Sequence, residues 1–278
     1  LYSVDKFKKA HFKNIKDVPF KKYDTAFICV PDNQKYKLAN FCLKNDKNVL
    51  IEKPLIFNNL KLYDNLKKLA EKKNLALYTA YNHRFEPGIK KIKNFLLKKK
   101  IGKVFHCRIF YGNGTSRLVK KSKWRDKELG VISDIGSHLL DMCMFIFDKD
   151  LTKIKLVKAN KFENKAPDHS IITLKYKDVE ILLEMTLCSW ENTFNCDIIG
   201  SKGSLHLNSL CKWSDSTFIY KKRKFPSGKP ITKKIVFPKG DPTWELEHKY
   251  MKRLIKQKKK KIFIKKDILI NKTLKILK

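Results

Sequence analysis

The stretch Thr25-Ala-Phe-Ile-Cys-Val-Pro-Asp-Asn33 decides the fold of this chain. Its apolar run, 25–30, is typical of a strand buried on both faces of a parallel sheet. Pro31 ends the run, and apolar residues then recur at helical spacing, with Lys35 and Lys37 largely on the solvated side. The stretch therefore predicts a strand and the crossover helix that follows it.

The same alternation continues over the first hundred residues. A second apolar run, 49–51, leads into Glu52-Lys-Pro54, and a helix is expected over about 60–69. A third strand is expected over 75–81. Strands that alternate with helices predict parallel pairing through right-handed crossovers, and hence a doubly wound α/β sheet.

The rhythm changes after a helix that begins at Pro87. The later segments are predicted mainly as strands, apart from a helix near 136–147 and a basic helical tail from Glu245, which indicates an α+β domain with an open, largely antiparallel sheet. We expect one domain over 1–85 and a second domain over 86–278. The expected strands of the second domain are 104–111, 152–160, 170–176, 179–186, 194–200 and 231–237.

The chain is strongly basic, with 63 Lys and Arg against 27 Asp and Glu and a net charge of +36. Such a balance is typical of nucleic-acid binding. Only six of the cations are arginines, the side chain best suited to bases and phosphates, and the lysine runs 98–100 and 258–261 are not interleaved with aromatics. We therefore expect a lysine-rich solvated surface and no specific nucleic-acid partner.

Several other classes are disfavoured. The longest apolar stretch, near 139–147, is about half of the roughly 20 residues that a membrane span needs, and Asp141 interrupts it. The seven cysteines show no C-x-x-C spacing and the seven histidines are dispersed, so we expect free thiols and no metal site. No signal-peptide pattern opens the chain, which favours the reducing cytoplasm.

Three clusters of polar residues could carry chemistry, and two of them contain carboxylates next to a possible proton donor or acceptor. Glu52 and Lys53 follow a predicted parallel strand, at the end where doubly wound sheets bind ligands. Asp134 and His138 lie four residues apart on one face of a helical turn, and an imidazole beside a carboxylate can accept a proton near neutral pH. Gly136 between them leaves room for a ligand. The simpler interpretations are a surface turn and a capped helix start.

A third cluster, Asn82-His83-Arg84-Phe85, stands at another strand end and is joined later by Trp124 and Arg125. The simpler interpretation here is a capped junction between strand and helix, in which His83 and Arg84 are exposed.

Taken in order, these clusters resemble the glucose-fructose oxidoreductase/inositol dehydrogenase/MocA (Gfo/Idh/MocA) family, from about Tyr23 to the C-terminus. The resemblance implies a partial dinucleotide-binding domain of the Rossmann type for NAD or NADP over 1–85. Over 86–278 it implies a domain whose open sheet lines the substrate site and mediates homo-oligomers, with a Gly-x-x-Gly hairpin at residues 198–205. The motifs that carry it are Cys29-Val-Pro-Asp-Asn33, Glu52-Lys-Pro54, Asn82-His-Arg-Phe85, Trp124-Arg125, Asp134-x-Gly-x-His138 and Gly200-Ser-Lys-Gly203.

The resemblance also implies roles for single residues. Lys53 matches the family's catalytic lysine, which hydrogen-bonds the reacting oxygen. Asp134 and His138 match its catalytic pair, in which His138 takes the hydroxyl proton as hydride leaves the same carbon. The expected activity is hydride transfer between the cofactor and a hydroxyl carbon of a sugar, sugar nucleotide or cyclitol. Expected cofactor contacts are Pro31, Asn33, Glu52, Lys53, Asn82, Trp124 and Arg125.

The sequence departs from the family in two places. Lys35 stands where the family usually has His. No G-x-G-x-x-G occurs, and its nearest equivalent, Gly112-Asn-Gly114, has no third glycine and no clear helix after it. We expect the phosphate-binding turn, and the residue that selects NAD or NADP, to lie upstream of Leu1. The chain is thus expected to be a fragment that lacks roughly 30 or more residues.

Three other functions stay open. One is a redox-neutral, NAD-dependent enzyme of the same family that cleaves glycosidic bonds, which would form no net NADH. Another is a catalytically silent protein that associates through its sheet. The last is non-specific nucleic-acid binding through the +36 charge, which would weaken steeply with salt.

Overall fold

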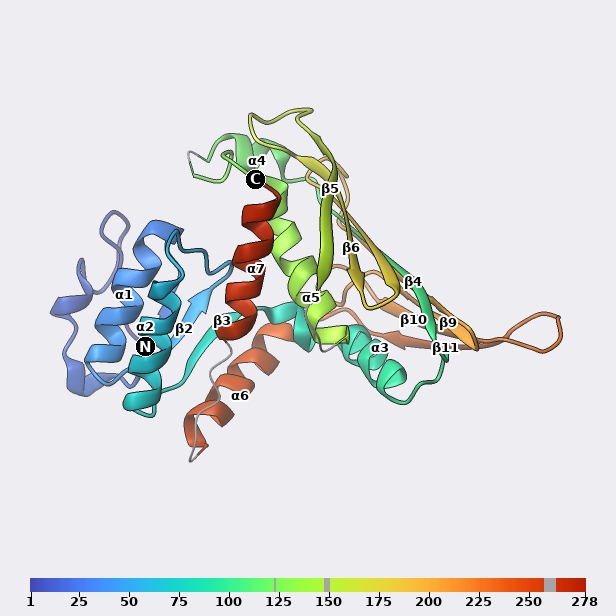
Figure 1. Ribbon diagram of the computed structural model, residues 1–278. Coiled ribbons are helices and arrows are strands. Elements are labelled where there is room, and N and C mark those ends of the chain that lie inside the picture. The colour runs from blue at the N-terminus through green and yellow to red at the C-terminus, as the bar shows by residue number, and fades with distance from the viewer. Residues whose placement is uncertain (123, 148–150, 258–263) are drawn as a thin grey trace. The chain divides into compact units, whose positions relative to one another are not determined.

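The computed structural model describes residues 1–122, 124–147, 151–257 and 264–278, which form two compact units (Figure 1). One unit comprises Leu1–Ala80 with Tyr250–Ile268, and the other comprises Tyr81–Lys249 with Leu269–Lys278. The lysine run 258–261 lies outside the described residues. The assignment of cofactor binding to 1–85 and of substrate binding to 86–278 stays a prediction.

The first unit is built on a three-stranded parallel sheet in the order β1-β2-β3. Two helices connect the strands and pack against each other (Figure 1). The alternation predicted from the sequence is confirmed, and with it the Rossmann-type fold of this unit. The elements are β1 (Thr25–Ile28), α1 (Asp32–Lys44), β2 (Asn48–Glu52), α2 (Lys61–Lys72) and β3 (Leu77–Ala80).

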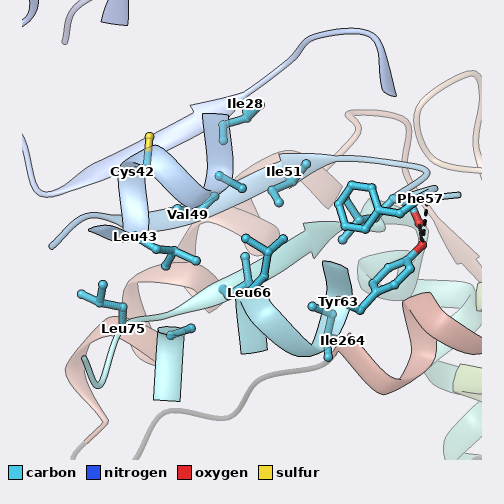
Figure 2. Close-up of a cluster of buried hydrophobic side chains, with 14 residues drawn as sticks. Ile28, Cys42, Leu43, Val49, Ile51, Phe57, Tyr63, Leu66, Leu75 and Ile264 are labelled. Atoms are coloured by element: carbon cyan, nitrogen blue, oxygen red, sulfur yellow. Dashed lines mark hydrogen bonds between the residues drawn. The ribbon is translucent and has the colours of Figure 1, made fainter. Parts of the chain in front are cut away.

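Apolar side chains from all of these elements form the core of the first unit (Figure 2). Ile28 of β1, Ile51 of β2 and Leu66 of α2 meet in this core, and Ile264 of the C-terminal helix joins them. The expectation that the first strand is buried on both faces is wrong. Within the described residues β1 pairs only with β2, so it lies at the edge of the sheet and Phe27 is 44% exposed.

The hydroxyl group of Tyr63, in α2, makes two hydrogen bonds to the segment that follows β2. Tyr63 Oη donates to the carbonyl oxygen of Leu55 at 2.6 Å and accepts the N–H of Phe57 at 3.2 Å (Figure 2). All three residues are buried, and burial raises the pKa of Tyr63. The residues just beyond Lys53 therefore have a fixed path.

The second unit is built on an eight-stranded sheet in the order β11-β10-β9-β8-β4-β7-β6-β5. The β4–β7 pair is parallel and the other described pairs are antiparallel, which confirms the predicted largely antiparallel sheet. The strands are β4 (Val104–Gly112), β5 (Thr152–Asn160), β6 (His169–Tyr176), β7 (Val179–Thr186), β8 (Thr193–Gly200), β9 (Gly203–Asn208), β10 (Ser216–Lys222) and β11 (Ile231–Phe237).

The apolar pattern predicts neither β9 nor β10, although the resemblance of residues 198–205 to the family's Gly-x-x-Gly hairpin implies the turn into β9. Both are short, and β10 ends in cations that hide its alternation of buried Phe218 and Tyr220 with more exposed residues. They form because β9 extends the hairpin from β8, with Gly200 opposite Gly203, and because β10 then pairs with β9. The sheet therefore contains two more strands than the apolar pattern indicates.

The helices of the second unit include α3 (Pro87–Leu97), α4 (Ser116–Lys120) and α5 (Ser137–Phe147), and the last is preceded by a π-helical turn over Ile132–Gly136. α5 packs beside α3 (Figure 1) and over the buried side of the sheet, where Cys143 lies close to Cys196. Two further helices, α6 (Thr243–Lys256) and α7 (Ile264–Ile276), each contribute residues to both units. None of the described helices has the length and apolar character required to span a bilayer.

The Tyr63 hydroxyl gives a direct test of the first unit. Tyr63→Phe leaves a buried carbonyl and a buried N–H without this partner, so we expect it to lower the free energy of unfolding by about 1–3 kcal/mol. Tyr23 is the matched control, because its buried hydroxyl makes no hydrogen bond within the described residues. Urea denaturation of both variants measures the difference, and an equal effect of the two changes would contradict this account.

Candidate functional site

Polar residues gather at the carboxyl ends of β1 and β2 in the first unit. β2 ends at Glu52, and Glu52 and Lys53 are both half-buried. The Lys53–Pro54 peptide bond is cis. Burial raises the pKa of the Cys29 thiol just beyond β1, the Glu52 carboxylate raises it further, and the Lys35 ammonium opposes both. These groups are therefore near neighbours, as parallel pairing of the two strands requires.

Two of the expected cofactor contacts lie at the start of α1. Pro31 occupies the N-cap position and Asn33 stands in the first turn, and both are exposed. They follow directly from the turn that ends β1. The first unit thus brings together Glu52 and Lys53 at the end of one strand, with Pro31 and Asn33 beyond the end of its neighbour.

In the second unit Asp134 lies in the π-helical turn that precedes α5. Its Oδ2 accepts a hydrogen bond from Nη2 of Arg125 at 2.6 Å, so two residues predicted for different roles form one ion pair. The expectation that Gly136 leaves room for a ligand is wrong. A Cβ at Gly136 would lie 2.9 Å from Sδ of Met185, so the glycine allows the helical turn to pack closely on β7.

His138, at the start of α5, lies against a second imidazole. The ring centroids of His138 and His83 are 4.2 Å apart with 39° between the ring planes, and Tyr81 meets His138 edge-on at 6.1 Å. His138 is half-buried and His83 is buried. The interpretation in which His83 and Arg84 are exposed is therefore wrong. The strand end that carries them turns inward and supplies one wall of the His138 environment.

A buried ion pair joins the two histidine-bearing segments. Nε of Arg84 donates to Oδ2 of Asp141 at 2.7 Å, and Nη2 of Arg84 pairs with Oδ1, which makes the contact bidentate. Arg84 follows His83 directly, and Asp141 lies one helical turn beyond His138. The ion pair therefore links the segment that carries His83 to the helix that carries His138.

The rest of this environment is aromatic and acidic. The Tyr111 ring lies beside His83, with 5.7 Å between the ring centroids and 48° between the ring planes. It also meets the Trp213 ring edge-on, with 5.1 Å between the centroids. Burial raises the pKa of Tyr111, and the carboxylates of Asp134, Asp241 and Glu86 raise it further. The Tyr111 hydroxyl therefore stays protonated at neutral pH and remains a hydrogen-bond donor.

Two more of the expected cofactor contacts lie in the second unit in quite different settings. Asn82 is buried, and its Nδ2 donates to Oγ1 of Thr243 at 3.0 Å. Trp124 is 62% exposed. The structure therefore places Arg125 against Asp134, Asn82 against Thr243 and Trp124 at the surface. The roles assigned to these residues stay predictions.

The residues present fit part of a nicotinamide cofactor. The carboxyl ends of β1 and β2 offer the acidic, cationic and amide groups that a ribose and a nicotinamide ring would need, at the edge where such sheets bind nucleotides. The glycine-rich turn that would hold the pyrophosphate is not in this sequence. Among the described residues, no group of three His, Cys, Asp or Glu side chains is placed to hold a metal ion.

Family models match both parts of the chain. Residues 2–81 match the oxidoreductase family with an NAD-binding Rossmann fold, and residues 89–206 match the GFO/IDH/MocA C-terminal domain. The chain belongs to the Gfo/Idh/MocA family of oxidoreductases.

Similar proteins share this architecture. Glucose-6-phosphate 3-dehydrogenase of Bacillus subtilis is 25% identical over 212 residues, which are 71% of this chain and 58% of that protein. Trans-1,2-dihydrobenzene-1,2-diol dehydrogenase of Xenopus tropicalis is 29% identical over 214 residues, 74% of this chain and 62% of that protein. The crystal structure of an NAD-binding oxidoreductase from Klebsiella pneumoniae superposes with a TM-score of 0.80 at 14% identity, covering 96% of this chain and 80% of that one. The matched part of the chain thus spans about three fifths of the length of the Bacillus subtilis and Xenopus tropicalis proteins.

Sequence reasoning missed three residues of these sites. Lys35 was placed outside but is buried, His83 was not given a role beside His138, and Arg84 was not paired with Asp141. One signal was available for the last pair. A lone Asp inside the apolar helix 139–147 needs a partner, because a buried carboxylate is stable only when it is paired.

The buried ion pair predicts a large and specific loss of stability. Arg84→Met leaves Asp141 buried without its cation, so we expect unfolding to become easier by about 3–5 kcal/mol. Arg108→Met is the matched control, since Arg108 pairs with Glu184 at 3.1 Å on an exposed face and should cost less than about 1 kcal/mol. Chemical denaturation of both variants measures the loss in free energy of unfolding. Similar losses would show that the buried ion pair stabilises the fold no more than the exposed one does.

The strand-end geometry of the first unit predicts a change in thiol reactivity. Because the Glu52 carboxylate raises the pKa of Cys29, Glu52→Gln should lower that pKa and increase the thiolate fraction at pH 8. We expect faster alkylation of Cys29 by iodoacetamide, followed by peptide mass spectrometry. Glu71→Gln, on the exposed side of α2, serves as the control and should leave the rate unchanged. An unchanged rate in Glu52→Gln would place the carboxylate away from the thiol.

Proposed function

We propose that the protein is an NAD(P)-dependent oxidoreductase that transfers hydride between a nicotinamide cofactor and a hydroxyl-bearing carbon of a sugar, sugar nucleotide or cyclitol. The observation that carries the proposal is the environment of His138, an imidazole that lies against a second imidazole, on segments that the Arg84–Asp141 pair links. Family membership supports the reaction class. The names of the two relatives, a sugar-phosphate dehydrogenase and a cyclic-diol dehydrogenase, support a ring alcohol as the substrate.

His138 is proposed as the general base. It would accept the proton of the substrate hydroxyl while the bound cofactor supplies the hydride chemistry. The His83 ring lies beside the His138 ring, with 4.2 Å between the ring centroids and 39° between the ring planes, and would help to orient it. A base that is oriented in this way loses less entropy when the substrate binds.

Lys53 and Asp134 are proposed to position the substrate. The Lys53 ammonium would donate to the reacting oxygen, where negative charge develops as the hydroxyl proton leaves. Asp134 would accept hydrogen bonds from neighbouring hydroxyl groups, and its ion pair with Arg125 holds the carboxylate in place. Pro31, Asn33, Glu52, Asn82, Trp124 and Arg125 are proposed to contact the cofactor. Association of copies through the open sheet face stays a prediction.

Activity measurements on single variants test the proposal. With the full-length protein, NAD⁺ or NADP⁺ and a panel of sugar phosphates and cyclitols, we expect net formation of reduced nicotinamide. His138→Ala should lower kcat by roughly 100- to 10,000-fold, because the general base is lost. Lys53→Met should also lower kcat. His106→Ala and Lys37→Met change exposed residues of the same types and should leave kcat unchanged.

Three results would contradict the proposal. Turnover that is unaffected by both His138→Ala and Lys53→Met would exclude the assigned roles. Product formed from a glycoside without net reduced nicotinamide would favour the redox-neutral reaction instead. A calorimetric titration of the full-length protein that detects neither NAD⁺ nor NADP⁺ binding would favour a catalytically silent protein.

A further inference from the structure

Lys35 is an unusual residue of the first unit. It is the fourth residue of α1, and it is only 2% exposed. Lysine is rarely buried to this extent unless its ammonium is paired. The neighbouring Lys37, on the same helix, is exposed as the helical pattern predicts. The burial of Lys35 therefore needs an explanation that is specific to its position.

Two hydrogen-bond acceptors surround the Lys35 ammonium. Its Nζ donates to the carbonyl oxygen of Pro54 at 2.7 Å and lies 2.7 Å from Oδ1 of Asp32. Burial lowers the pKa of Lys35, the carboxylates of Asp32 and Glu52 oppose this, and the Lys53 ammonium adds to it. The Lys35 ammonium thus lies among the polar groups around the end of β2, which are those of Asp32, Glu52 and Lys53 and the carbonyl of Pro54.

The contact with Pro54 fixes the chain immediately after Lys53. The carbonyl that Lys35 binds belongs to the next residue, and Tyr63 holds Leu55 and Phe57 a little further on. The segment 53–57 is therefore fastened at two points, by α1 near its start and by α2 near its end. Lys35 is the fastening that lies closer to Lys53.

We propose that Lys35 is a positioning residue, which holds the Lys53–Pro54 turn and so fixes the place from which the Lys53 side chain acts. This inference rests on the proposed function of Lys53. A lysine suits the task because its ammonium has three donors on a long stem and can bind a carbonyl and a carboxylate together. A neutral histidine side chain, the type that the family usually has at this position, has a single N–H and could donate to only one of the two acceptors.

The first measurement needs neither cofactor nor turnover. Hydrogen exchange followed by mass spectrometry reports on the amides of Leu55, Ile56 and Phe57 in the full chain. Lys35→Met should speed exchange in the peptide that covers this segment, by about tenfold or more, because one anchor is removed. Lys37→Met should leave it unchanged. Equal exchange in the Lys35 and Lys37 variants would overturn the proposal.

A milder variant serves if Lys35→Met does not fold. Asp32→Asn removes the charge of the carboxylate partner but leaves the bond to Pro54 available. It should change exchange in the same segment and in the same direction, but less. Exchange in Asp32→Asn that matches the parent chain would count against an anchor that depends on this ion pair.

A double-mutant cycle on kcat separates positioning from general stability. Lys35→Met should lower kcat by about 10- to 100-fold, the scale of a small misplacement of a reacting group. In a Lys53→Met background the same change should have almost no further effect, because the group that it positions is gone. Equal losses in both backgrounds would show that Lys35 does not act through Lys53.

The cycle also distinguishes failure of this inference from failure of the proposed function. If Lys53→Met alone leaves turnover unchanged, the role of Lys53 is wrong, while the exchange result still decides whether Lys35 holds the turn. Lys35→Arg keeps a charged donor and should recover part of both the protection and kcat. Full loss of both in Lys35→Arg, with a normal unfolding temperature, would contradict the role of the cationic donor.

Discussion

A charge inside this protein is stable only when an opposite charge or a set of hydrogen bonds surrounds it, and each unit buries such a charge next to residues proposed for catalysis. In the second unit the guanidinium of Arg84 is satisfied by both oxygens of Asp141. In the first unit the ammonium of Lys35 is satisfied by Asp32 and by the carbonyl of Pro54. Neither charge could enter the interior alone, so each one draws distant segments of its own unit into a fixed arrangement.

The segments that these charges fix are the ones that carry the proposed chemistry. Arg84 and Asp141 flank the stacked pair of His83 and His138, and Lys35 binds the carbonyl that follows Lys53. The desolvation of such charges is costly, and a hydrophobic side chain of similar size would often give equal or better stability. Their presence beside Lys53 and His138 is consistent with a fold that spends stability on preorganised reacting groups.

Much of the fold followed from local patterns. The alternation of strands and helices over the first hundred residues, and the series of strands in the second half, come from apolar periodicity, which is a property of each segment alone. The apolar pattern does not reveal β9 and β10, because both are short and their pairing depends on the hairpin from β8. Only the resemblance of residues 198–205 to a family hairpin implies the start of β9. Of the site, the sequence located Glu52 and Lys53 and the Asp134–His138 turn. It could not place Gly136 against Met185, because that contact joins a helical turn to a strand that comes about 50 residues later.

By itself the sequence determined the class of the two units, the order of the family motifs and the strand and helix ends on which the polar residues stand. Only the tertiary structure decided which side chains meet. It buried Lys35 although its helical position resembles that of an exposed lysine, and it placed the ring of His83 against that of His138, which comes 55 residues later in the chain. The physical reason is that periodicity assigns a residue to a face of its own element, whereas burial and charge pairing depend on what packs against that face.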